Sequence, residues 1–116
     1  MTEIPYKQYV ILPAELGMST GKAVSQGCHA AHMALKMENP DKILVWEAKG
    51  QCVLVCRVKT IAALKDTLMY LRDAGITCHL YIDEGYTEVD AFTPTALATG
   101  IIEPDKYWIF DKLELY

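Results

Sequence analysis

Apolar residues recur along the chain with two spacings, which predict alternating strands and helices. Compact apolar runs bounded by Pro, Gly or turn residues predict strands over residues 8–12, 52–58, 76–82 and 93–99. Capping residues followed by apolar positions predict helices over residues 22–36, 40–50 and 61–75; the candidate caps are Ser19 or Thr20, Asn39 and Thr60. Pro94 restricts the fourth strand to a strand start or a sheet edge. A short helix after Glu103 and a segment over residues 108–115, which either closes the sheet or packs on it, complete the pattern.

This order of elements predicts the α/β class, with a mixed sheet and helices packed on it. The 116 residues are the length of one ordinary domain, and they contain no repeat and no linker. We therefore expect one domain over residues 1–116.

Composition narrows the functional classes. Hydrophobic residues make up 52% of the chain, which excludes intrinsic disorder, and the apolar runs are too short to cross a membrane. The net charge is -4, and eight of the fifteen acidic residues lie from Asp83 onward, which argues against a generic nucleic-acid binder. No signal peptide is visible, and the four cysteines lie in apolar segments. We expect a cytoplasmic protein with reduced cysteines in its core and no membrane partner.

Three polar residues share one face of the first predicted helix. Lys22, Gln26 and His29 lie four and three residues apart, beginning in the first helical turn. A lysine at that end opposes the helix dipole unless an anion binds there, which favours a phosphate or carboxylate site. The alternative is an ordinary solvent-exposed face, as on most surface helices. The opposite side of the helix carries enough small and apolar residues to bury it: Ala23, Val24, Ala31, Ala34 and Leu35.

A second candidate site lies after the third predicted strand. Asp83 follows the strand's carboxyl end, where ligand sites of α/β sheets gather, and it could activate a water molecule. Thr87 or Thr95 could then hydrogen-bond a substrate oxygen. The alternative is an ordinary turn capped by Asp83, because Asp-x-Gly is common turn chemistry.

Metal and nucleotide sites have weak support in the sequence. Cys52 and Cys56 share a strand face, with Cys78 and His79 on another strand, but the spacing lacks the geometry of a zinc knuckle. Cys28 and His29 point about 100° apart on a helix and cannot form a nucleophilic pair. Gly17 and Gly21-Lys22 do not have the spacing of a phosphate-binding loop. We expect no metal ion and no cofactor.

Several motifs in order resemble the type 2 peptidyl-tRNA hydrolases, the archaeal and eukaryotic kind. Residues 16–31, LGMSTGKAVSQGCHAA, are similar to that family's L-x-M-x-x-G-K-x-x-x-Q-x-x-H-A. Further on, the W-E-x-x-G-Q of residues 46–51, the D-x-G-x-T of residues 83–87 and the T-A-L-A-x-G of residues 95–100 resemble family motifs. The closing KLELY is similar to the family's usual end, so the resemblance covers almost the whole chain.

The resemblance implies an enzyme that hydrolyses the ester between a peptide and the terminal ribose of a tRNA, without metal or organic cofactor. It also implies a three-layer fold around a four-stranded mixed sheet, and a homodimer. Gly21, Lys22 and Tyr86 are then expected to bind substrate. Carried over by position, the active-site set is Lys22, Gln26, His29, Asp83, Thr87 and Thr95. Asp83 is our candidate for the general base.

The chain departs from the family pattern beside the site. Ser19-Thr20 and Cys52-Val53 stand where the family has lysines, Tyr86 replaces an arginine, and Ala91-Phe92 replaces Pro-Gly. Fewer basic residues weaken phosphate binding, so two hypotheses remain. One is a hydrolase whose remaining lysines form a patch, with Tyr86 stacking on the terminal base; the other is a non-catalytic binding module or an enzyme for another acylated substrate. The lysines of that patch are Lys7, Lys22, Lys36, Lys42 and Lys49.

Overall fold

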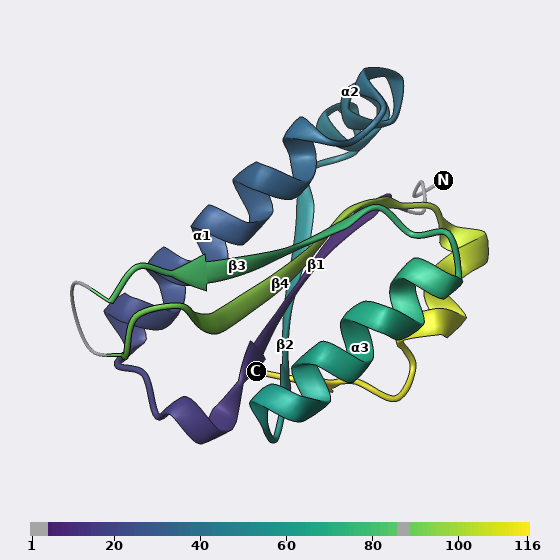
Figure 1. Cartoon of the computed structure of the whole chain (residues 1–116). Coiled ribbons are helices and arrows are strands. Elements are labelled where there is room, and N and C mark those ends of the chain that lie inside the picture. Colours follow the sequence, from purple (N-terminus) through teal and green to yellow (C-terminus); the bar gives the residue numbers. More distant parts are fainter. Residues whose placement is uncertain (1–4, 86–88) are drawn as a thin grey trace.

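The computed structural model describes residues 5–85 and 89–116, which form a mixed sheet with helices on both faces (Figure 1). The strands are β1 (Lys7–Pro13), β2 (Cys52–Val58), β3 (Cys78–Asp83), β4 (Thr93–Ile102) and β5 (Glu114–Leu115). The α-helices are α1 (Thr20–Lys36), α2 (Pro40–Ala48) and α3 (Ile61–Asp73). Two short 3₁₀ helices follow β1 and β4: η1 (Ala14–Leu16) and η2 (Pro104–Phe110). The predicted α/β class is confirmed, and none of the described helices is long and apolar enough to cross a membrane.

The sheet of the described residues has five strands in the order β3-β4-β1-β2-β5, so the expectation of four strands is wrong. β1 pairs parallel with β2 and antiparallel with β4, which also pairs antiparallel with β3. The additional strand, β5, adds antiparallel to β2 through the pairs Cys56–Leu115 and Arg57–Glu114. The sequence left open whether residues 108–115 close the sheet or pack on it; Glu114 and Leu115 extend the sheet, and because two residues are too few for an alternating pattern, tertiary pairing decides this strand.

The two faces of β1 bury against different helices. Tyr9 and Ile11 belong to a core cluster with α3, whereas Val10 and Leu12 belong to a cluster with α1. Because successive strand residues point to opposite faces, α1 and α3 lie on opposite sides of the sheet. The helix residues that fill these clusters are Leu64, Leu68 and Leu71 from α3, and Ala23, Ala30 and Ala34 from α1. The expected three layers are therefore present in the described chain.

Side chains cap the helices where the sequence predicts their starts. Ser19 accepts a hydrogen bond from the backbone of α1, Asn39 from that of α2, and Thr60 from that of α3. Each cap satisfies a backbone N–H that the first helical turn leaves unpaired. Gly75 follows α3 with φ 76°, a left-handed conformation that glycine adopts without strain.

The buried face of α1 differs from the one that the sequence suggested. Val24 is 59% exposed and Cys28 is exposed, although we expected both to be buried. Gln26 is only 2% exposed, so the polar stripe is not simply a solvated face. The reason is that α1 lies across β3, β4 and β1, which turns Ala23, Gln26 and Gly27 toward the sheet. A β-carbon on Gly27 would lie 3.2 Å from Val10, so its lack of a side chain permits this close approach.

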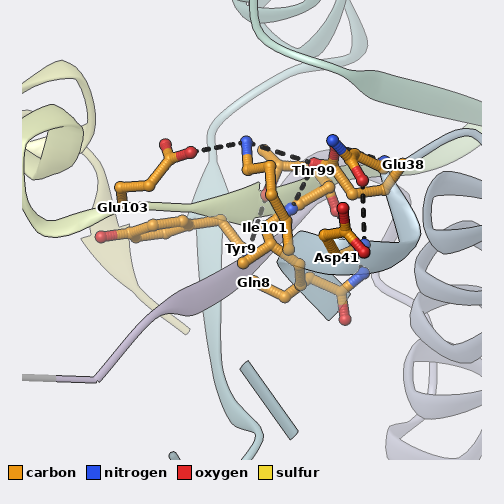
Figure 2. A network of polar contacts seen from close by, with 10 residues as sticks. Gln8, Tyr9, Glu38, Asp41, Thr99, Ile101 and Glu103 are labelled. Atoms are coloured by element: carbon orange, nitrogen blue, oxygen red, sulfur yellow. Dashed lines mark hydrogen bonds and ion pairs between the residues drawn. The ribbon is translucent and has the colours of Figure 1, made fainter. Parts of the chain in front are cut away.

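A polar network fixes the carboxyl end of α1 against the sheet (Figure 2). The Gln8 side-chain amide donates to the carbonyl oxygens of Ala31 in α1, at 3.1 Å, and Thr99 in β4, at 3.0 Å. Glu38, just beyond α1, accepts the backbone N–H of Ile101 at 2.7 Å. These bonds fix the position of α1 along the sheet. They therefore also help to place the first turn of α1 beside the end of β3.

Candidate active site

Lys22 and Asp83 form an ion pair where the first turn of α1 meets the end of β3. The Lys22 Nζ lies 2.9 Å from the Asp83 Oδ1, and the two side chains are 10% and 7% exposed. Ser19 caps this end of α1 by accepting the Lys22 backbone N–H at 3.2 Å. The two candidate sites of the sequence therefore form one site.

Asp83 is held as a carboxylate by its neighbours. The hydrogen bond from Lys22 is the largest influence, and it lowers the pKa of Asp83 below the ordinary value of 3.8. Burial opposes this effect, while the Gly85 N–H, which donates to the Asp83 Oδ2 at 2.7 Å, and the charge of His29 act in the same direction as Lys22. Asp83 therefore carries its negative charge at neutral pH.

Thr95 and Gln26 form a second buried polar pair beside the first. The Thr95 hydroxyl donates to the Gln26 Oε1, and both residues are almost completely buried. The pairing of β3 with β4 shifts between Tyr81–Ala96 and Ile82–Pro94, which leaves Thr95 as the extra residue of a β-bulge. Ala96 also packs on the α1 side of the sheet. The bulge thus turns two successive residues toward α1, where regular alternation would turn one of them away.

His29 lies one turn beyond Gln26, and its ring stacks on Tyr81. The ring centroids are 4.7 Å apart and the planes differ by 16°. Tyr81 is two residues before Asp83 in β3, so both side chains face α1. Tyr81 was not among the predicted site residues. Its position two residues before Asp83, which places both side chains on the same strand face, was the available signal.

The turn after Asp83 is tightly closed. Gly85 has φ 87°, and a β-carbon there would lie 2.6 Å from the backbone of Ala91. The Phe92 backbone N–H donates to the Asp83 carbonyl oxygen at 2.6 Å. Phe92 was not a predicted site residue; the available signal was that Ala91-Phe92 stands where the resembling family has Pro-Gly.

Two predicted site residues, Tyr86 and Thr87, lie outside the described residues. Gly21 is exposed in the first turn of α1, and a β-carbon there would meet no atom within 4 Å. The start of α1 thus presents its backbone to open space beside Lys22. Among residues 5–85 and 89–116, no three His, Cys, Asp or Glu side chains are grouped to hold a metal ion.

The predicted lysine patch does not form one surface beside the site. Lys42 pairs with Glu103 at 2.8 Å, and Lys7 lies 4.1 Å from the centre of the Tyr107 ring. Both lie at the end of the sheet opposite Asp83, because Lys7 pairs with the last residue of β4 while Asp83 pairs with the first. Lys36 ends α1, about 21 Å from Lys22 along the helix axis. Only Lys22 of this set reaches the site.

The assembled geometry suits acyl chemistry on a bound ester. A carboxylate stands next to an ammonium group, and an amide and a hydroxyl lie one helical turn away. A carboxylate can accept a proton from water, and the ammonium group can stabilise negative charge that develops on an oxygen.

Comparisons with known proteins agree with this chemistry. The family model described as "Peptidyl-tRNA hydrolase PTH2" matches residues 6–116. The peptidyl-tRNA hydrolases of Methanothermobacter thermautotrophicus and Methanocaldococcus jannaschii are each 34% identical to the chain, over 107 and 110 residues, and each match covers 92% of the chain and 93% of the relative. "Peptidyl-tRNA hydrolase 2, mitochondrial" of Bos taurus is 31% identical over 98 residues, which cover 82% of the chain and 55% of that protein.

Proposed function

The chain belongs to the Peptidyl-tRNA hydrolase PTH2 family, and from this we propose that it hydrolyses the ester between a peptide and the 3'-terminal ribose of a tRNA. Relatives that match nearly end to end carry the name of this activity. The observation that carries the proposal is the buried pair of Lys22 and Asp83 at the open start of α1. The pair places an ionised carboxylate, which can accept a proton, next to an ammonium group, which can stabilise negative charge.

We assign the general base to Asp83. In the free protein Lys22 lowers its pKa, which makes the carboxylate a weak base. A substrate oxygen that takes over the Lys22 ammonium group would release the carboxylate and raise its basicity. Water then attacks the ester carbonyl carbon as Asp83 accepts its proton. The bond between the carbonyl carbon and the ribose oxygen breaks, and that oxygen leaves as a hydroxyl group with the proton that Asp83 took from water, which restores the carboxylate.

Lys22 and Gln26 orient the ester in this proposal. The oxyanion that forms on the carbonyl oxygen lies within reach of the Lys22 Nζ, which stabilises it most strongly in the transition state. Because the Gln26 Oε1 accepts from Thr95, the Gln26 amide NH₂ is turned away from Thr95 and is available to donate to the substrate. His29, held against Tyr81, and Thr87 complete the proposed set.

We propose that the tRNA body extends along the molecule from the site. Lys36 at the far end of α1 lies about 21 Å from Lys22 along the helix axis, a distance suited to a phosphate of the acceptor stem rather than of the terminal nucleotide. The chain carries a net charge of -4, so these contacts must be local. Binding should therefore weaken as salt rises, with a modest slope that reflects few phosphate contacts.

We also propose that the protein forms a homodimer and acts in the cytoplasm. An apolar groove of about 430 Å³ lies between α1 and β2, and its lining includes Val24, Val53, Val55 and Tyr116. The valines are exposed because α1 covers β3, β4 and β1 but leaves this face of β2 open. In a two-fold symmetric dimer, this groove would pack against the same groove of a second copy. Sedimentation equilibrium, which measures the mass of the protein in solution, tests whether the dimer forms.

The test is release of free tRNA from N-acetylaminoacyl-tRNA at low salt. We expect Asp83→Asn to lower kcat/KM at least about a hundredfold, because the amide cannot accept the proton. Asp66→Asn makes the same chemical change on the exposed surface of α3 and is the matched control. Absence of cleavage by the wild type, or full activity of Asp83→Asn, would refute the proposed function or the assignment of the base, respectively.

A further inference from the structure

Phe92 combines an exposed ring with an unfavourable backbone conformation beside the site. Its side chain is 80% exposed, the highest value among the large hydrophobic residues of the described chain. Its φ is 64°, a conformation that a side chain disfavours and glycine accepts. Among residues 5–85 and 89–116, no burial of the ring offsets this cost. Outliers of this kind gather at functional sites.

The backbone of Phe92 is fixed relative to Asp83. Its N–H donates to the Asp83 carbonyl oxygen at 2.6 Å, and the neighbouring pair Asp83–Thr93 continues the sheet. On the other side, Ala91 is packed so closely on Gly85 that no β-carbon would fit there. The ring of Phe92 is therefore attached to a tightly held segment at the edge of the proposed active site.

We propose that Phe92 contacts the peptide side of the ester and favours substrates whose esterified residue has a large apolar side chain. This inference rests on the proposed function. An apolar side chain that covered the ring would remove apolar surface from water, and this burial would offset the unfavourable φ.

Charge distinguishes the two parts of the substrate. Glu84 and Asp90 are exposed acids on either side of this turn, and they repel the phosphates of a nucleic acid. An uncharged peptide side chain meets no such repulsion. Bases also stack on aromatic rings, so a contact with the terminal adenine is the competing outcome that the experiment must separate.

The experiment compares two esters that share one tRNA and differ only in the esterified residue, N-acetylphenylalanine or N-acetylalanine. Phe92→Gly removes the ring and permits the positive φ, so the variant should fold; Phe92→Ala removes the ring alone. We expect both variants to lower kcat/KM about tenfold for the phenylalanyl ester and about twofold or less for the alanyl ester. Trp108→Ala, which removes an exposed aromatic ring from η2, is the control and should preserve the wild-type ratio between the esters.

An equal loss on both esters would overturn the proposal and assign the ring to the tRNA end that they share. Unchanged values for both esters would overturn it as well. A wild-type protein that cleaves neither ester would refute the proposed function itself. That result is distinct from cleavage with unaltered selectivity, which refutes only the role of Phe92.

Discussion

Replacing Lys22 by methionine tests whether the buried ion pair connects the stability of the protein to its chemistry. Methionine keeps an unbranched side chain of similar length and removes the charge. Asp83 would then retain the Gly85 N–H as a partner but lose the ammonium group 2.9 Å away. A nearly buried carboxylate without its counter-charge is unfavourable, so the folded state should lose stability.

The magnitude follows from distance and burial. At 2.9 Å the pair attracts by about 6 kcal/mol with an effective dielectric constant near 20, and desolvation of both groups offsets part of this. Removal of one partner from a buried pair costs about 3–5 kcal/mol, and the slight exposure of both side chains places this pair at the lower end. We expect Lys22→Met to lower the free energy of unfolding by about 3 kcal/mol at pH 7.

The pH dependence has a defined sign. Because folding lowers the pKa of Asp83 below 3.8, the contribution of the pair is complete above that value and is lost as the pH falls through the lowered pKa. Lys22→Met removes the largest cause of the shift, so the pKa of Asp83 rises. The free energy of unfolding of the variant should therefore change less as the pH falls below about 4. The acid limb of its residual kcat/KM should also move to higher pH.

Urea unfolding of the wild type, Lys22→Met, Asp83→Asn and the double variant measures the interaction as a double-mutant cycle. We expect the double variant to be more stable than the sum of the single effects predicts, by about 1–3 kcal/mol. The acid limb comes from kcat/KM measured against pH. Additive effects together with an unmoved acid limb would refute the reasoning, since they would mean that the two groups do not interact in solution.

Two further substitutions test the frame around this pair. Thr95→Val leaves the buried Gln26 Oε1 without its donor, so it should lower the free energy of unfolding by about 1–3 kcal/mol and also lower kcat/KM. Thr95→Ser keeps the hydroxyl and should lose less stability and less activity. Equal losses in the two variants would contradict the role of the hydrogen bond. Gly85→Ala places a β-carbon at φ 87° and 2.6 Å from Ala91, so thermal unfolding should show a loss of at least about 2 kcal/mol. A loss below about 0.5 kcal/mol would mean that the turn is not closed as described.

The amino-acid sequence alone determined most of the local structure. The caps Ser19, Asn39 and Thr60 marked the helix starts, because short polar side chains satisfy the unpaired N–H groups of a first turn. The compact apolar run of β1 and the spacing of the leucines in α3 indicated the core, because a strand buried on both faces is apolar throughout and a helix buried on one face has apolar residues three and four apart. The motifs also indicated the residues Lys22, Gln26, Asp83 and Thr95, whose side chains the fold brings together in two adjacent pairs.

Tertiary structure decided which of these side chains meet and which face water. The bulge at Thr95 turns this residue toward Gln26, and a register shift depends on pairing with another strand rather than on local sequence. The docking of α1 across three strands exposed Val24 and buried Gln26, because a helix has no inner side until a sheet covers it. Pairing over long sequence separation also added β5, whose two residues carry too little pattern to specify a strand by themselves.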